Sequence, residues 1–362
     1  MSDLHVLANV DPNVLVPPPP LGVNMRKLPI FAAHPLQHAY RSPVSGLQLP
    51  VEFHAYSADN TAIVCLANAD KVSDFLRPIG YKPVVVVVGP KESERYELEV
   101  DKEYAIVNLV MNDYADTSAG PYQALPLSIF ALPLDREHSK EVTQLRDPVA
   151  ALLPLLDPAV AMVMGPLAMS KNQAAFDVGR DVMGIDKFVA DVRINHDDGG
   201  TTTNVTFEKN QLLYVRVNDG SPVELLDAQA RLFSQLDIFG SFKLLLGKNE
   251  PIEHSFIGWN GRSPTMNDPK GAPQQPPMAA YCTSYTLNSP AFKLWSKQDD
   301  KFDFSPGCPL TDRLSEFECK PILASRDRHV SVAVVRDDDK TRALQAAVET
   351  WSAAAAHGRQ IS

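Results

Sequence analysis

The chain has 362 residues, of which 44% are hydrophobic, and its 44 acidic and 34 basic side chains give a formal net charge of −10. This length and hydrophobic content allow a sizeable core, and we expect one large globular unit with an elaborated periphery. The acidic balance, without a stripe of Lys and Arg, argues against nucleic acid and anionic membranes as partners.

The four cysteines are scattered through the sequence without a C-x-x-C pair or the spacing of a metal site. This pattern predicts reduced thiols and no disulfide framework. The N-terminus lacks a charged region followed by an apolar segment, and no apolar run is long enough to cross a membrane. We therefore expect a cytoplasmic protein.

Prolines are frequent in the first 45 residues, with four in a row from Pro17 to Pro20 and little hydrophobic periodicity. A proline run favours an extended segment without internal hydrogen bonds. We predict an N-terminal arm over residues 1–45 that lies on the body of the protein or on a neighbouring subunit, and we expect a homo-oligomer.

Residues 46–337 are predicted to form the main domain, and strands dominate its first half. Alternating or β-branched runs predict strands, and Asn68 is placed to begin a short helix. The predicted strands are 51–56, 83–88, 96–100, 104–111 and 122–132, with the helix at 69–76.

The second half continues as a meander of strands joined by Asp-Gly turns. A stretch rich in Pro, Gly and Asn at 247–290 predicts a long irregular loop. Helical patterns are found near 224–236 and in a C-terminal helix within 338–362, and 139–156 predicts a helix or a pair of turns. The predicted strands are 160–164, 188–195, 201–208, 212–217 and 329–335.

One lysine, Lys187, lies among apolar residues in the stretch from Val178 to Val192. A period of two makes this stretch apolar on both faces, which predicts a buried strand. Burial disfavours an ammonium ion and lowers its pKa, so the amine becomes able to attack a carbonyl carbon. The alternative is a solvated surface charge, because lysine is rarely buried.

The same stretch resembles the signature of the acetoacetate decarboxylase family, which has Val-Gly-Arg-Glu and then Pro-Lys-Lys a few residues later. Gly179, Arg180 and Lys187 fall on the family's Gly, Arg and Schiff-base lysine. Residues 113–127, DYADTSAGPYQALPL, are similar to the family's Asp-Thr-Ser, Gly, Tyr-x-Glu segment that lines the same pocket. The resemblance to the acetoacetate decarboxylase-like superfamily extends over roughly residues 50 to 220.

The sequence departs from the family pattern at positions that matter for the chemistry. Asp181 replaces the first glutamate, Phe188 replaces the second lysine, and Ala124 replaces the pocket glutamate. That glutamate belongs to the decarboxylation machinery of the family's type members, so acetoacetate itself is not implied as the substrate. Loss of the second lysine leaves desolvation as the means of lowering the pKa of Lys187.

The resemblance implies an α+β fold with a large, mostly antiparallel, barrel-like β-structure and peripheral helices. It implies that Lys187 is the Schiff-base nucleophile, and we add Tyr122 as a candidate proton donor. Tyrosines on half-buried strands also serve as packing residues with a satisfied hydroxyl. The candidate substrate-binding residues are Tyr114, Gln123, Arg180 and Phe188.

We therefore predict a cofactor-independent lyase that acts on a keto acid or related carbonyl compound through a lysine Schiff base, with decarboxylation as the first choice. The same iminium serves a Schiff-base aldolase or dehydratase. A non-catalytic small-molecule-binding relative, in which Lys187 is only a charge, is the alternative from another class.

Motifs of other enzyme classes are absent from the sequence. It contains no G-x-G-x-x-G, no Walker loop, no H-E-x-x-H and no G-x-S-x-G. His196 precedes two aspartates and two glycines, a sequence that favours a hairpin turn over a metal ligand. We expect neither a metal nor a cofactor.

Overall fold

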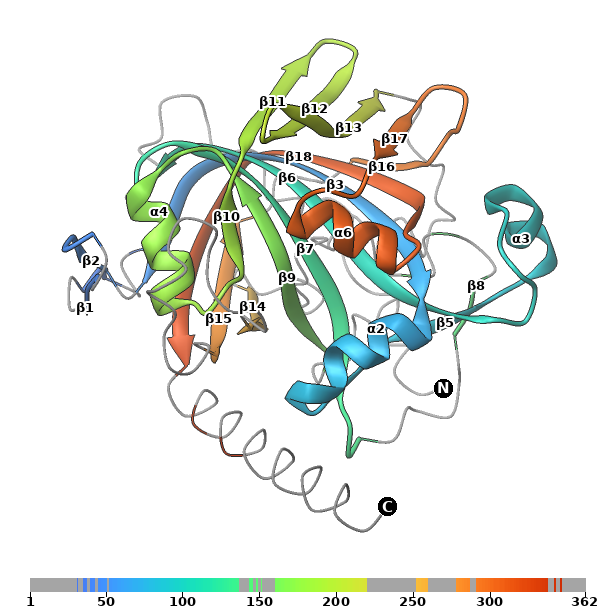
Figure 1. The fold of residues 1–362 in the computed structure, drawn as a ribbon, viewed down its shortest axis with the longest axis horizontal. Coiled ribbons are helices and arrows are strands. Elements are labelled where there is room, and N and C mark those ends of the chain that lie inside the picture. Colours follow the sequence, from blue (N-terminus) through green and yellow to red (C-terminus); the bar gives the residue numbers. More distant parts are fainter. Residues whose placement is uncertain are drawn as a thin grey trace, which may run out of the picture.

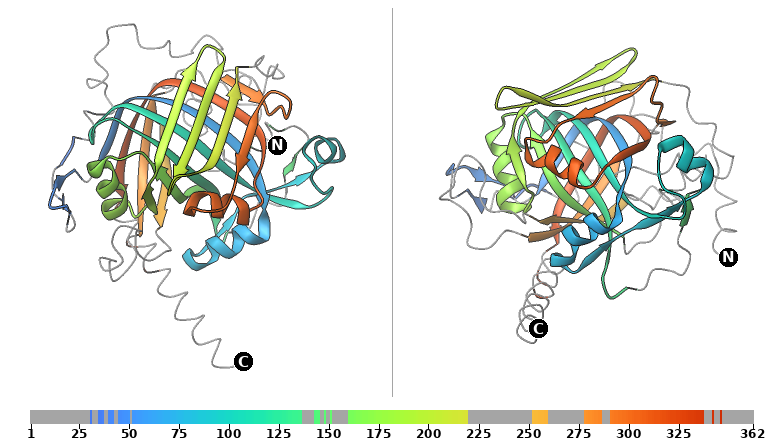
Figure 2. Two further views of the ribbon diagram at one scale, coloured as in Figure 1. Left: turned by 45° about the horizontal axis from the view of Figure 1, so that its top comes forward. Right: turned by 45° about the vertical axis from the view of Figure 1, so that its right-hand side comes forward.

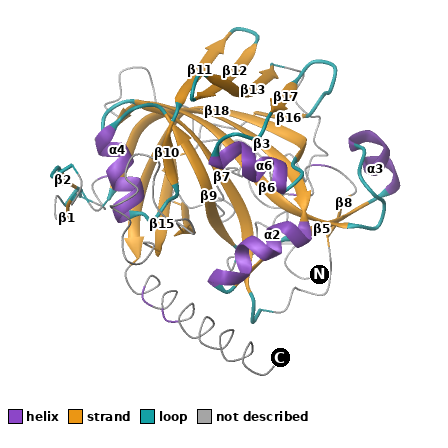
Figure 3. Cartoon of the chain, in the orientation of Figure 1, coloured by secondary structure: helices purple, strands orange, loops and turns teal. Residues whose placement is uncertain are grey.

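The computed structural model describes residues 31, 35–37, 40–42, 45–50, 52–136, 143–145, 148, 151, 160–219, 252–259, 278–286, 291–337, 342 and 346. Within them, the strands form one sheet of twelve, one of four and one of two (Figure 1). Helix α6 (Pro309–Glu316) lies across the outer face of the large sheet, and helix α3 (Pro90–Tyr96) lies beyond its edge (Figure 3). Among the described helices, none combines the length and the apolar character needed to cross a membrane.

The strands of the large sheet are β3 (Phe53–Asn68), β4 (Tyr81–Pro83), β5 (Val85–Val88), β6 (Glu103–Thr117), β7 (Tyr122–Pro133), β8 (Thr143–Leu145), β9 (Ala161–Met169), β10 (Lys187–Val189), β14 (Ile252–Trp259), β15 (Met278–Thr286), β16 (Ala291–Leu294) and β18 (Lys320–Asp337). The other strands are β1 (Tyr40–Arg41), β2 (Gln48–Leu49), β11 (Asp191–Asp197), β12 (Gly200–Phe207), β13 (Asn210–Asn218) and β17 (Lys301–Phe304). The helices are α2 (Ala69–Leu76), the 3-10 turn η3 (Arg77–Ile79), α3 (Pro90–Tyr96), α4 (Gln173–Asp177), the π-helix η5 (Val178–Val182) and α6 (Pro309–Glu316).

The long strands of the large sheet curl around a common interior (Figures 1 and 2). Strand β6 pairs with β7, β7 with β9, β9 with β14, β14 with β15, β15 with β18, β18 with β3, and β3 again with β6. Only the β9–β14 pairing in this series is parallel. The predicted α+β class, with a mostly antiparallel, barrel-like β-structure, is confirmed.

Side chains alternate between two apolar clusters along these strands because successive residues of a strand point to opposite faces. On β6, Ile106 and Val110 belong to the inner cluster, whereas Val107 and Leu109 belong to the outer cluster. The outer cluster also contains residues of α2, α6, β12 and β13. Burial on both faces explains why the strands are apolar throughout.

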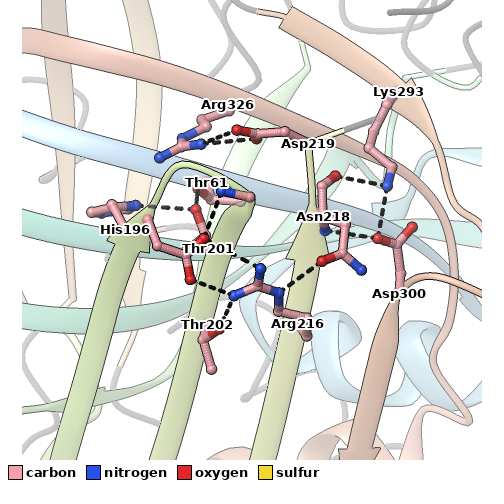
Figure 4. Close-up of polar contacts among 12 residues, drawn as sticks. Thr61, His196, Thr201, Thr202, Arg216, Asn218, Asp219, Lys293, Asp300 and Arg326 are labelled. Atoms are coloured by element: carbon pink, nitrogen blue, oxygen red, sulfur yellow. Dashed lines mark hydrogen bonds and ion pairs between the residues drawn. The ribbon is translucent and has the colours of Figure 1, made fainter. Parts of the chain in front are cut away.

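The sheet of β11, β12, β13 and β17 lies across the outer face of the large sheet (Figure 2). Polar contacts join the two sheets at one edge (Figure 4): Thr61 of β3 shares a hydrogen bond of 2.8 Å with Thr201 of β12. Arg326 of β18 binds Asp219, just after β13, with both nitrogen–oxygen distances at 2.8 Å. These contacts hold the outer sheet in place over the apolar cluster.

The hairpin predicted around His196 is confirmed, since Asp197 pairs with Gly200 at the end of β11 and β12. A Cβ on Gly200 would lie 2.0 Å from the carbonyl oxygen of Val217, so a side chain has no room there. The imidazole of His196 lies 3.0 Å from the hydroxyl of Thr201 (Figure 4).

Helix α2 has the predicted bounds, and the side chain of Asn68 caps it by accepting from the backbone N–H groups of Asp70 and Lys71. The strand predicted at 96–100 is wrong, because Tyr96 ends helix α3. Pro90 occupies the first turn of α3, where its fixed φ favours a helix. Glu97 then takes a left-handed conformation with φ of 55° that ends the helix.

The prediction of an irregular loop throughout 247–290 is also wrong, because β14 and β15 lie in this range. Their partners β9 and β18 are distant in the sequence, so local composition concealed them. The strand predicted at 83–88 is divided between β4 and β5, and 143–145 of the predicted helix or turns forms β8 instead. Helix 224–236, most of the arm and most of the C-terminal helix lie outside the described residues.

Candidate functional site

A pocket lies inside the curled sheet, with a cavity volume of about 80 Å³. A single water needs roughly 10–15 Å³ on the same measure, so the cavity suits a ligand of only a few heavy atoms. Its wall is mostly apolar, with residues such as Phe53, Met164 and Val332. The lining side chains with polar atoms are Asn60, Asn112, Tyr114, Tyr122, Ser128 and Lys187.

Lys187 begins β10 and lies opposite Leu167 of β9 in a parallel pairing. It is only 4% exposed, and its Nζ donates a hydrogen bond of 2.9 Å to the carbonyl oxygen of Ala175. Burial lowers the pKa of Lys187 to about 7. The prediction that Lys187 is buried in an apolar cavity is confirmed.

The segment before Lys187 is helical, so the strand predicted from Val178 is wrong in its first part. Asn172 caps α4, which continues into the π-helix η5. A π-helix is wider than an α-helix and is often found at functional sites. The chain then turns at Gly184, with φ of +63°, and brings Lys187 back beside the helix.

Gly179 of the π-helix provides the space that the lysine side chain occupies. A Cβ at this position would lie 2.0 Å from Cε and 2.2 Å from Nζ of Lys187. The backbone of η5 therefore packs directly against the lysine stem, and this contact explains the need for glycine eight residues before the lysine.

Tyr122 and Tyr114 lie in the same pocket as Lys187, so the two sequence segments meet there as predicted. The Nζ of Lys187 is 5.7 Å from the ring centroid of Tyr122, and the two tyrosine rings are 4.7 Å apart. Burial raises the pKa values of both phenols, and for Tyr122 the nearby Tyr114 adds to this effect. Both hydroxyls therefore keep their protons at neutral pH.

Gln123 and Phe188 point away from the pocket, because each follows a pocket residue on its strand. Gln123 donates to the carbonyl oxygen of Ile194 at 2.8 Å and accepts from its backbone N–H at 2.9 Å. Phe188 lies in the outer cluster, with its ring 5.9 Å from that of Phe207. The described pocket lining therefore includes neither Gln123 nor Phe188, which the sequence had suggested as substrate-binding residues.

Arg180 is also outside the pocket lining, and its guanidinium binds the carboxylates of Asp177 and Asp181 on the same helical segment. It lies 2.9 Å from Asp181 and 3.6 Å from Asp177, and it stacks 5.0 Å from the ring centroid of Phe176. Arg180 is 7% exposed and Asp177 is fully buried. The arginine of the signature thus stabilises the helical segment that carries Gly179.

Two interior asparagines, Asn60 and Asn112, line the pocket although the sequence did not point to them. They are cross-strand neighbours on β3 and β6. Ala124 of β7, at the position of the family's glutamate, lies opposite Asn112 on the other side and is 1% exposed. A polar residue at an inward position of an apolar strand was the signal that could have identified both asparagines.

The described residues contain no group of three His, Cys, Asp or Glu side chains that could hold a metal ion. The pocket instead offers one amine, two phenols, two amides and one hydroxyl in an apolar enclosure. An amine of this kind can form a covalent bond with the carbonyl carbon of a ligand.

Solved structures similar to this chain include acetoacetate decarboxylases. One, from Legionella pneumophila, has 8% identity and a TM-score of 0.45 over 78% of this chain and 85% of its own. Another has 12% identity and a TM-score of 0.43 over 79% and 89%. The enduracididine biosynthesis enzyme MppR, complexed with pyruvate, has 8% identity and a TM-score of 0.42 over 78% and 87%.

No protein-family model matches the sequence, and no curated protein matches it either.

Proposed function

We propose that this protein is a lyase that acts on small carbonyl compounds through a Schiff base on Lys187. The observation that carries the proposal is a buried lysine amine at the wall of a small apolar pocket. With a pKa of about 7, roughly half of the amine is neutral at pH 7, whereas a lysine at 10.4 is neutral in about one molecule in 2,500.

The neutral Nζ of Lys187 attacks the carbonyl carbon of the ligand and forms a carbon–nitrogen bond. The carbonyl oxygen takes up one proton from the amine and one from its surroundings, and it leaves as water. The resulting iminium withdraws electrons from the neighbouring carbon, so a bond one carbon further away becomes able to break.

Three reactions share this iminium: decarboxylation of a keto acid, cleavage of an aldol and dehydration. Decarboxylation of a keto acid is the reaction that the sequence resemblance implies. Tyr122, close to the amine, is proposed to hydrogen-bond the carbonyl oxygen while it leaves. Its raised pKa makes it a hydrogen-bond donor more than an acid, because general acids work best near the operating pH.

The competing function is a binding protein in which Lys187 forms no covalent bond. Reduction with borohydride distinguishes the two, since it converts an iminium into a stable secondary amine. We expect that acetone or acetoacetate with borohydride adds one ligand fragment to the protein, located on Lys187 by peptide mass spectrometry.

Lys187→Arg should abolish the adduct, because a guanidinium does not form the iminium. Lys171→Arg is the matched control, since Lys171 is exposed just before helix α4 and should leave the adduct unchanged. An adduct of equal yield in Lys187→Arg would contradict the proposed nucleophile.

A further inference from the structure

We propose that Asn60 and Asn112 form a polar subsite for a hydroxyl group, so that the preferred ligand is a neutral hydroxy ketone or hydroxy aldehyde. The inference rests on the proposed Schiff base at Lys187 and narrows its substrate class from carbonyl compounds in general.

The first support is the unmet hydrogen-bonding capacity of the two amides. Asn60 is 5% exposed and Asn112 is 1% exposed, and both line the pocket of Lys187. The Oδ1 atom of each is buried without a hydrogen-bond partner among the described residues. Buried amide oxygens are nearly always paired, so the two oxygens are available to accept a hydrogen bond from a donor group of the ligand.

The second support is the position of the pair. Asn60 and Asn112 are cross-strand neighbours, so their side chains project together from one face of the sheet. They share the cavity with Lys187, and the small volume of this cavity keeps any bound ligand close to all three residues. A hydroxyl near the carbonyl carbon can therefore donate its one proton to either amide oxygen while the carbonyl carbon meets the amine.

The third support is the charge of the pocket. Its described lining contains no Asp, Glu, His or Arg, and Lys187 is the one cationic side chain in it. A carboxylate bound there would lose its hydration and pair with Lys187 in its ammonium form. That pairing raises the pKa of Lys187 and removes the nucleophile, whereas a neutral hydroxyl leaves the amine free to react.

Three ligands of similar size test the inference on the unmodified protein: 4-hydroxy-2-butanone, 2-butanone and acetoacetate. The measured quantity is the concentration of each that gives half-maximal borohydride trapping at pH 7. We expect this concentration to be about fivefold lower for the hydroxy ketone than for 2-butanone, as one added hydrogen bond implies. Acetoacetate should need the highest concentration of the three.

Asn60→Leu and Asn112→Leu keep the side-chain size and remove the acceptors, so the double variant should lower the ratio of hydroxy-ketone trapping to 2-butanone trapping. Asn108→Leu is the matched control, because Asn108 is a buried amide of β6 outside the pocket lining. If a variant does not fold, the comparison of ligands on the unmodified protein still decides.

The outcomes separate the two proposals. If no ligand is trapped, the Schiff base itself is refuted. If 2-butanone is trapped but the hydroxyl gives no advantage, or the advantage survives in the double leucine variant, only the asparagine subsite is refuted.

Discussion

Replacement of Gly179 by alanine should disable the amine while the fold persists. The added Cβ would lie 2.0 Å from Cε and 2.2 Å from Nζ of Lys187. An ordinary contact of a Cβ is 3.4–4 Å, so the end of the lysine must move by roughly 1–2 Å. A displacement of about 1 Å of a reacting group costs on the order of 100-fold in rate.

The effect on stability should be much smaller than the effect on reactivity. The atoms that collide are the far end of a flexible side chain, and alanine favours a helix over glycine by about 1 kcal/mol. We therefore expect borohydride trapping to slow by about 100-fold, with the free energy of unfolding within about 2 kcal/mol of the original.

Gly89→Ala is the matched control, because a Cβ there meets no atom closer than 3.5 Å. It should leave the trapping rate unchanged. Trapping by Gly179→Ala at the original rate, in a folded protein, would refute the contact between the π-helix and the lysine as the reason for this glycine.

Three further predictions concern stability. The pKa of Lys187 is about 7 in the folded protein and about 10.4 in the unfolded chain, so the unfolded chain binds more protons between these pH values. The free energy of unfolding should therefore rise by roughly 4–5 kcal/mol from about pH 7 to 10.4. The denaturant midpoints of Lys187→Met should lack this rise, and an equal rise in the variant and the original protein would contradict the lowered pKa. Phe188→Lys places an ammonium in the outer apolar cluster, so the free energy of unfolding measured in urea should fall by about 3 kcal/mol or more. The pKa of Lys187 should not change, because residue 188 points away from the pocket. Gln123→Leu removes both hydrogen bonds to Ile194 and should cost about 2 kcal/mol with unchanged borohydride trapping; slower trapping would place Gln123 in the site after all.

Local chemistry in the sequence determined several elements of this protein. Asn68 begins α2 because its side chain caps the helix, and the Asp-Gly turn after His196 reverses the chain into β12. The apolar residues near Lys187 in the sequence predicted its burial, and its lowered pKa follows from that burial. These features depend on residues close together in the chain.

Other features were decided only by contacts between distant segments. β14 and β15 are strands through their pairing with β9 and β18, although the composition around them is typical of a loop. The amides of Asn60 and Asn112 are neighbours because β3 pairs with β6 in that register, although the two residues are far apart in the sequence. Gln123 and Phe188 face outward because the curl of the sheet assigns one face of each strand to the pocket and the other to the outer cluster. Apolar alternation shows that a strand has two faces, but the tertiary packing determines which face lines the cavity.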